Sequence, residues 1–331
     1  MENYTVIPKI AVHPDRIVYY KSYVGNRSRL HRSTEFNPPP TEHKHEGNVS
    51  QKASRKITKA ITYLVECSKV KSFASDKYKK VFPFRIAFIT LTLPSKQIHT
   101  DKEIMKSIFH QFLVQAKVKW KVSRYVWRSE RQKNGNIHFH ILVDRFVPWS
   151  ELRDTWNNCT EKLGYISAYR NEMRRFHNGG FKCRQELLQN WSYKKQLIAY
   201  HSGVANDWSS PNSTDVHAVK QIQNIKAYVC KYMLKSSQSD ADIARLWGCS
   251  YELSRAKGAV MALDSYVSTA IERIRFLFHP KEFSKEHFSV MFIDCVHLAR
   301  AGLESLFEPF QAYMLETFNH NVNVAVSVAC K

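Results

Sequence analysis

Residues 123–144, SRYVWRSERQKNGNIHFHILVD, are the stretch that decides the expected fold. Residues 123–131 and 137–144 are rich in the β-branched and aromatic side chains that favour strands. Asn134-Gly135 lies between them, and both residue types tolerate the positive φ angles of a tight turn. We therefore expect an antiparallel β-hairpin over these residues.

Strands and helices are predicted on both sides of this hairpin. Residues 84–93 favour a strand, and Thr100-Asp101-Lys102-Glu103 has the pattern of a capping box that begins an amphipathic helix of about 18 residues. After the hairpin, Pro148-Trp149-Ser150 begins a second helix, which ends at Gly164. A further strand is expected near residues 216–222. The predicted order is therefore β-α-β-β-α-β.

The remaining segments differ from this central part in composition. Residues 1–80 are basic and irregular, and we expect a flexible or peripheral arm there. Residues 165–215 are polar and loop-rich, which predicts an insertion with at most a short strand near Tyr165–Tyr169. The predicted domains are thus the arm, a domain over residues 81–236 that contains the insertion, and a mostly helical region over residues 237–331. Helical runs in that last region are expected at 240–247, 258–278 and 289–307.

The charge of the chain points to a polyanionic partner. The sequence has 50 Lys and Arg against 29 Asp and Glu, a formal net charge of +21, and the excess lies within residues 1–235. The alternative is that the basic composition serves solubility alone. The seven cysteines include no Cys-x-x-Cys pair, which argues against a disulfide framework and against a zinc finger. Because the N-terminus lacks an apolar signal-peptide core and no run of about 18 apolar residues occurs, we expect a cytoplasmic protein without membrane association.

The hairpin carries a candidate metal site. His138 and His140 are two residues apart on a strand, so both imidazoles point to one face and Phe139 points to the other. Glu130 on the partner strand is the nearest carboxylate that could serve as a third ligand. A two-residue turn would direct Glu130 to the wrong face, whereas a three-residue loop at 134–136 would pair it with His140. The site therefore predicts a bulged turn, although a His-x-His pair on a strand also arises by chance.

A second cluster of chemically active residues follows the insertion. Asn224 is a suitable cap for a short helix that continues to about Lys235. Tyr228 and Tyr232 are four residues apart and share one face of that helix, and Lys231 and Lys235 each follow a tyrosine by three residues. A phenol has a pKa of about 10, so nearby positive charge favours its nucleophilic phenolate form. The alternative is that the tyrosines pack in a core and the lysines face solvent.

Together the two clusters are suited to attack on a phosphodiester. A metal that withdraws charge from a phosphate oxygen makes the phosphorus more open to attack by a tyrosine oxygen. The product is a phosphotyrosine ester, which conserves the bond energy for a later rejoining. No Gly-rich phosphate loop with Lys-Ser/Thr occurs in the sequence, so we expect no built-in ATPase or helicase.

The order of these motifs resembles that of the His-hydrophobic-His (HUH) endonucleases that initiate rolling-circle replication. Residues 88–93 resemble the first motif of that family, His138-Phe139-His140 the second, and Tyr228 to Tyr232 the third. The Tyr-x-x-Lys-Tyr-x-x-Lys form is most similar to the two-tyrosine initiators of small single-stranded DNA phages. The resemblance covers residues 84–236.

The resemblance implies a fold and a ligand set. The expected fold is α+β, with a central antiparallel sheet flanked by helices in a split β-α-β, ferredoxin- or RRM-like arrangement. His138, His140 and Glu130 would bind Mg²⁺ or Mn²⁺. This set matches the family motif by position.

The resemblance also implies the reaction and the partners. Tyr228 and Tyr232 would be the nucleophiles, with Lys231 and Lys235 as further catalytic residues, and Lys231 matches the family's motif lysine most directly. The protein would nick single-stranded DNA at a replication origin, form a 5′-phosphotyrosine link and later rejoin the strands. It would act in the cytoplasm of a bacterial host together with host helicase and polymerase.

Three other functions remain open at this stage. A two-tyrosine transposase of the same chemistry would carry a cysteine-rich zinc-binding segment, which the sequence lacks, and in a conjugative relaxase the tyrosine normally precedes the histidine motif. A non-catalytic protein that binds single strands by stacking is the third. We also hypothesise that the arm and the insertion grip DNA. Aromatic side chains of the insertion would either stack on bases or pack internally: Trp191, Tyr193, Tyr200 and Trp208.

Overall fold

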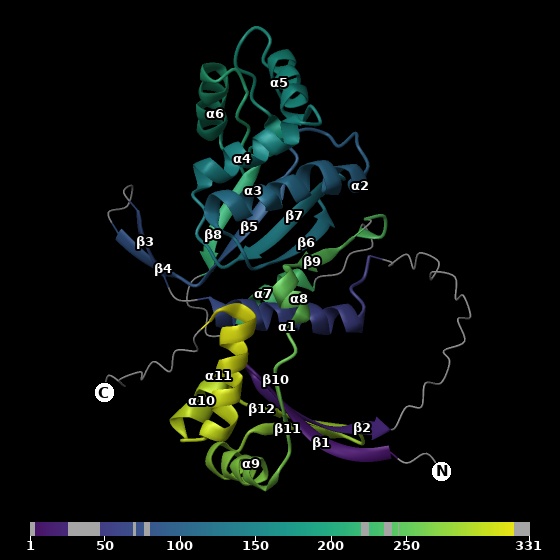
Figure 1. Ribbon diagram of the computed structural model, residues 1–331. Coiled ribbons are helices and arrows are strands. Elements are labelled where there is room, and N and C mark those ends of the chain that lie inside the picture. The colour runs from purple at the N-terminus through teal and green to yellow at the C-terminus, as the bar shows by residue number, and fades with distance from the viewer. Residues whose placement is uncertain are drawn as a thin grey trace, which may run out of the picture. The chain divides into compact units, whose positions relative to one another are not determined.

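The computed structural model describes residues 4–25, 47–68, 71–75, 80–219, 225–234, 240–243 and 245–320. These residues form an α+β protein with antiparallel sheets and flanking helices, so the predicted fold class is confirmed (Figure 1). The chain divides into two compact units, one of residues 44–250 and one of residues 1–43 with 251–331. This division differs from the three consecutive segments that the sequence suggested.

The unit of residues 44–250 contains a five-stranded antiparallel sheet. Its strand order is β8-β5-β7-β6-β9. The first four of these strands follow the predicted β-α-β-β-α-β order along the chain, which is the split β-α-β arrangement. The strands are β5 (Ile86–Thr92), β6 (Tyr125–Arg131), β7 (Ile137–Val143), β8 (Thr214–Val219) and β9 (Trp247–Cys249).

Helices cover one face of this sheet and bury its apolar side chains. They are α2 (Asp101–Ile104), a π-helical turn (Met105–Phe109), α3 (His110–Trp120) and α4 (Trp149–Glu161). The capping box at Thr100 and Glu103 is present, as predicted. Alternate strand residues such as Leu91 and Phe139 pack against these helices in the core. The polar residues between them therefore face the other side of the sheet.

Two helices lie on that other side. They are α1 (Gln51–Cys67) and α7 (Ile225–Met233), which contact each other and lie side by side in Figure 1. Ser50 caps α1 by accepting a hydrogen bond from the N–H of Ala53, and the helix also contacts β6 and β9. A separate hairpin follows α1 and consists of β3 (Lys71–Ser75) and β4 (Lys80–Phe84).

The insertion at residues 165–215 is helical where a loop-rich segment was expected. It contains α5 (Tyr165–Phe176), a 3₁₀ turn (Gln185–Leu187) and α6 (Tyr193–Ala205), so the strand predicted near Tyr165–Tyr169 is wrong. Gly164 has φ +75° and joins α4 directly to α5. The carboxylate of Glu161 accepts hydrogen bonds from the first N–H groups of α5, which caps the helix. This cap precedes the helix and lacks the usual Ser, Thr, Asp or Asn pattern.

The second unit corrects the interpretation of the N-terminal arm. Residues 4–25 form β1 (Tyr4–His13) and β2 (Arg16–Gly25), so they are not irregular. Their sheet has the order β10-β1-β2-β12-β11, with β10 (Ala259–Ala262), β11 (Lys281–Lys285) and β12 (Phe288–Phe292). The partners of the N-terminal hairpin are more than 230 residues away in sequence, so local patterning could not reveal the pairing.

The C-terminal region contains helices as predicted, with strands between them. The helices are α8 (Tyr251–Arg255), α9 (Ser265–Phe278), α10 (Cys295–Arg300) and α11 (Glu304–Phe318). The runs expected to be helical at 258–278 and 289–307 each include a strand, and the described part of 240–247 leads into β9 without an α-helix. Among the described helices, none is both long and apolar enough to cross a bilayer.

Candidate functional site

The turn between β6 and β7 sets the direction of Glu130. The N–H of Gln132 donates to the carbonyl of Asn136 at 2.9 Å, and the N–H of Gly135 donates to the carbonyl of Gln132 at 2.9 Å. Gly135 has φ +83°, the left-handed conformation of a three-residue bulged hairpin loop. The predicted bulged turn is therefore confirmed.

The register of the hairpin differs from the prediction by two residues. Glu130 pairs with His138, whereas it was expected opposite His140. The loop begins one residue earlier than expected, at Lys133, which moves each cross-strand partner by two positions. Because side chains alternate with a period of two, this shift leaves Glu130 on the same face as both histidines.

Glu130, His138 and His140 converge on one point, and we call them the Glu–His–His cluster. Oε1 of Glu130 lies 2.8 Å from Nε2 of His138 and 3.1 Å from Nε2 of His140. One ligand atom from each residue lies within 4.8 Å of the other two. The three side chains are between 12% and 18% exposed, so a ligand in solution can reach them. Two imidazole nitrogens and a carboxylate form a donor set that suits a divalent cation.

The electrostatics of the cluster keep its carboxylate ionised. Burial acts to raise the pKa of Glu130, but the hydrogen bonds and positive charge of His138 and His140 outweigh it. The pKa of Glu130 is therefore well below its usual range. An ionised carboxylate is the form that ligates a metal.

Thr90 fixes the ring of His140, and the sequence analysis did not single it out. Thr90 lies opposite His140 in the pairing of β5 with β7, and its Oγ1 is 3.1 Å from Nδ1 of His140. With the ring proton on Nδ1 and shared with Thr90, the lone pair of Nε2 is directed at the Glu–His–His cluster. The only signal in the sequence was the position of Thr90 within the strand at residues 88–93.

A buried ion pair lies beside the cluster and was also missed. Arg128 is opposite His140 on β6, and its Nη2 lies 3.2 Å from Oδ2 of Asp240, with both side chains at most 1% exposed. Burial lowers the pKa of the guanidinium, while the carboxylates of Asp240 and Glu130 oppose that shift. Oδ1 of Asp240 also accepts the N–H of Arg131 at 2.8 Å. Asp240 thus ties the segment that follows α7 to the strand that carries Glu130.

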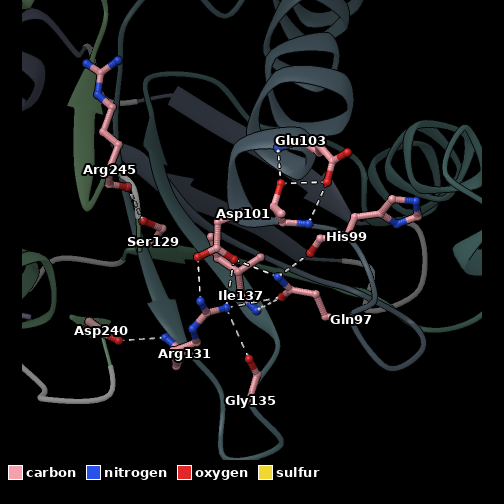
Figure 2. A network of polar contacts seen from close by, with 11 residues as sticks. Gln97, His99, Asp101, Glu103, Ser129, Arg131, Gly135, Ile137, Asp240 and Arg245 are labelled. Atoms are coloured by element: carbon pink, nitrogen blue, oxygen red, sulfur yellow. Dashed lines mark hydrogen bonds and ion pairs between the residues drawn. The ribbon is translucent and has the colours of Figure 1, made fainter. Parts of the chain in front are cut away.

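A polar network holds the hairpin against the start of α2 (Figure 2). Arg131 forms a two-pronged contact with Asp101, with nitrogen–oxygen distances of 2.9 and 2.6 Å. Gln97 accepts the N–H of Ile137 at 2.7 Å and donates to Asp101 at 2.8 Å. Since Arg131 follows Glu130 and Ile137 precedes His138, the network fixes the backbone on both sides of the Glu–His–His cluster.

The helix α7 brings one predicted nucleophile to this face of the sheet. Val229 and Met233 are buried at 0% and 1% exposure, whereas Tyr232 is 43% exposed. The ring of Tyr232 lies 6.1 Å from that of Phe88, and the ring of His140 lies 5.1 Å from the same Phe88 ring. A tyrosine and a cluster histidine therefore contact one common side chain.

The other predicted catalytic residues are described less fully. Tyr228 lies in α7, four residues before Tyr232, and its side chain is outside the described part of the structure. Lys231 is exposed on α7. Lys235 falls outside the described residues. The roles of these residues stay predictions.

His217 and Asp215 on the edge strand β8 are neighbours of the site that sequence reasoning missed. They pair across the sheet with Phe88 and Thr90, respectively, so they lie on the face of the cluster. Nδ1 of His217 is 3.3 Å from Oδ2 of Asp215, and the His217 ring stacks on Phe88 at 5.2 Å. Phe88 thus contacts His140, His217 and Tyr232.

Comparison with known proteins gives one match. Residues 86–237 match a family of replication-associated proteins that is named after ORF2. The matched stretch is somewhat less than half of the chain and includes the Glu–His–His cluster and α7. No curated protein and no solved structure matches the chain significantly. Over this stretch the chain is similar to replication-associated proteins, which supports a role in initiating rolling-circle replication.

Proposed function

We propose that the unit of residues 44–250 nicks single-stranded DNA by metal-dependent attack of a tyrosine, in the manner of the two-tyrosine HUH endonucleases. The single observation that carries this proposal is the position of Tyr232 and His140 on either side of Phe88. It puts a candidate nucleophile next to a three-residue ligand set. The similarity to replication-associated proteins supports the same reaction class.

Glu130, His138 and His140 would hold one Mg²⁺ or Mn²⁺ ion. Their donor set fits such a cation, and the contact of Thr90 with His140 gives one imidazole a fixed orientation. When bound, the cation would withdraw charge from the scissile phosphate and make its phosphorus more electrophilic. Glu130 is held ionised by its two histidine neighbours and needs no proton release before binding.

The nucleophile in this reaction is a tyrosine hydroxyl of α7. Its oxygen forms a bond to phosphorus and its proton is released, while the bond from phosphorus to the 3′ oxygen breaks. That oxygen takes up a proton and leaves as a 3′-hydroxyl, which can prime a polymerase. The ester on tyrosine retains the phosphodiester energy, so attack by another 3′-hydroxyl rejoins a strand without ATP.

The pair of tyrosines suits repeated cleavage during replication. While Tyr228 or Tyr232 holds the DNA, the other would make the next cut and release a unit-length circle. The substrate would be single-stranded DNA at a replication origin. Unwinding and synthesis would be supplied by a host helicase and a host polymerase, and the excess of basic residues favours binding to the DNA backbone.

An adduct assay tests the proposal. The full chain is mixed with single-stranded DNA of its own replicon and Mn²⁺, denatured, and examined for protein that still carries DNA. We expect an adduct that is lost in the Tyr228→Phe/Tyr232→Phe double variant and in His138→Ala. Matched controls are Tyr266→Phe and His287→Ala, whose side chains are exposed in the other unit.

Two outcomes would contradict the proposal. Binding of DNA by the wild-type chain without any adduct would favour the non-catalytic binding protein. An adduct that persists in the double tyrosine variant would show that another residue is the nucleophile.

A further inference from the structure

The hairpin of α5 and α6 encloses a second site, separate from the Glu–His–His cluster. It is a pocket of about 180 Å³, and we call it the aromatic pocket. One water molecule needs roughly 15 Å³ of such space, so the pocket has room for an organic ring. Six rings of its lining matter for the argument: Tyr169, Phe176, His177, Phe181, Tyr200 and Trp208.

The turn after α6 is strained in a way that places Trp208 in the pocket wall. Asp207 and Trp208 have φ of +52° and +50°, a left-handed conformation that is unfavourable for residues other than glycine. Arg174 holds the Asp207 carboxylate through Nε and Nη2 at 2.9 and 2.6 Å, and Arg170 donates to the Asp207 carbonyl at 3.2 Å. These contacts to arginine compensate the strain and fix the turn.

The body of α6 is also shaped to receive the indole of Trp208. A Cβ atom at Gly203 would lie 2.3 Å from Nε1 of Trp208, so only glycine leaves room for the ring. The indole lies 5.8 Å from the His177 ring, and Phe181 lies 6.1 Å from it, both within 15° of parallel. The walls are therefore flat rings with nearly common planes, a geometry that stacks on flat ligands.

His177 adds a directional polar group to the wall. Its Nδ1 accepts a hydrogen bond from the N–H of Lys182 at 3.3 Å, so the neutral ring carries its proton on Nε2. Burial and the charge of Arg184 lower the pKa of His177, which favours this neutral form. The ring can thus donate one hydrogen bond to a ligand acceptor.

The surroundings of the pocket are basic and carry further aromatic side chains. Lys182 is exposed in the lining, and Trp191 beside it is 40% exposed. Acidic residues of the segment 165–211 are fewer than basic ones. The basic residues are Arg170, Arg174, Arg175, Lys182, Arg184, Lys194 and Lys195, and the acidic residues are Glu172, Glu186 and Asp207. This balance complements a phosphate backbone.

We propose that the aromatic pocket binds an unpaired base of single-stranded DNA, with the neighbouring phosphate near Lys182. Every nucleobase has a π-face, and aromatic platforms with adjacent cations are how proteins hold single strands. A paired base is stacked in its duplex and cannot enter. The proposal rests on the proposed function, since that function supplies single-stranded DNA, and it adds a second contact point for the same strand.

Binding of a labelled single-stranded 20-mer to the full chain tests this inference. EDTA is present so that no cleavage occurs, and a duplex of the same sequence is measured alongside. We expect Tyr200→Ala/Lys182→Ala to weaken single-strand binding by about tenfold, with a much smaller change for the duplex. The control Tyr266→Ala/Lys281→Ala removes the same two residue types from the other unit and should leave binding unchanged.

A second measurement covers a double variant that fails to fold. Lys182→Ala alone, at an exposed position, should still weaken single-strand binding by a few-fold, and Trp208→Phe should reduce the tryptophan quenching that the 20-mer causes. Unchanged affinity in folded Tyr200→Ala/Lys182→Ala, or equal losses in the control, would overturn the inference. So would unchanged quenching in Trp208→Phe.

The pocket and the proposed nuclease can fail separately. With the pocket intact, His138→Ala should lose the covalent adduct and keep single-strand binding in EDTA. If the wild-type chain forms no adduct but the pocket variants still lose single-strand affinity, the nuclease proposal fails and the pocket inference stands.

Discussion

The two faces of the central sheet carry opposite kinds of side chain on the same strands. On the helix-covered face, Leu91 and Phe139 are fully buried among apolar neighbours. On the other face, Thr90, His138 and His140 are partly exposed and contact polar partners. The alternation of strand residues thus separates stability from chemistry at intervals of one residue. Substitutions on the two faces should therefore have different consequences.

The largest effect is expected from Phe139→Ala. Phe139 is fully buried and its ring lies 4.1 Å from that of Phe109, so its loss leaves a cavity in the core. The free energy of unfolding should fall by about 3–5 kcal/mol. Chemical denaturation measures this change. His138→Ala, one residue away, should change it by less than about 1 kcal/mol and abolish adduct formation; equal destabilisation by both variants would break the separation of the faces.

Asp240→Ala should give the next largest effect, because it crosses the separation between the two faces. The change leaves the Arg128 guanidinium buried without its ion-pair partner, which costs about 3 kcal/mol of unfolding free energy. The double variant Arg128→Met/Asp240→Leu should recover most of this loss, since neither charge remains. Denaturation of the single and double variants provides the comparison, and a double variant no more stable than Asp240→Ala would refute the account of this pair.

Thr90→Val should affect metal binding and spare stability. It removes the hydroxyl that contacts Nδ1 of His140 and keeps the shape of the side chain. Loss of such a supporting contact typically weakens metal affinity by about tenfold. Titration of Mn²⁺ by calorimetry should reveal the change, and Thr90→Ser should bind like the wild type. A normal Mn²⁺ affinity in Thr90→Val would mean that the hydroxyl does not orient the imidazole.

The smallest effect is expected at the turn of the hairpin. Gly135 has φ +83° and no other group lies within 4 Å of the place that a Cβ atom would occupy, so Gly135→Ala tests backbone strain alone. We expect a loss of about 1 kcal/mol of unfolding free energy. Gly135→Asn should cost less, because asparagine tolerates the left-handed conformation. Thermal melting of the two variants compares them, and equal Tm values for alanine and wild type would contradict the bulged turn.

Local patterns in the sequence were sufficient for the elements that hold the cluster. Alternation predicted β5, β6 and β7, and the face shared by Glu130, His138 and His140 followed from it. The register was off by two residues because a composition that favours a turn does not specify where its loop begins. That error did not change the face.

Features that depend on distant parts of the chain were not predictable in this way. The contacts of Thr90 with His140 and of Arg128 with Asp240 require the cross-strand register and the course of the chain after α7. The pairing of residues 4–25 with β10 and β12 joins opposite ends of the sequence. Polar side chains on the solvent side of α5 and α6 made those helices resemble loops.

Mass spectrometry of the covalent product tests the central claim most directly. After reaction with single-stranded DNA and Mn²⁺, nuclease and trypsin digestion leave a nucleotide on the attacking residue. Cleavage after Lys226, Lys231 and Lys235 separates Tyr228, in AYVCK, from Tyr232, in YMLK. The account predicts the added nucleotide mass on one or both of these peptides. Its presence on any other peptide, or on none, would contradict the account.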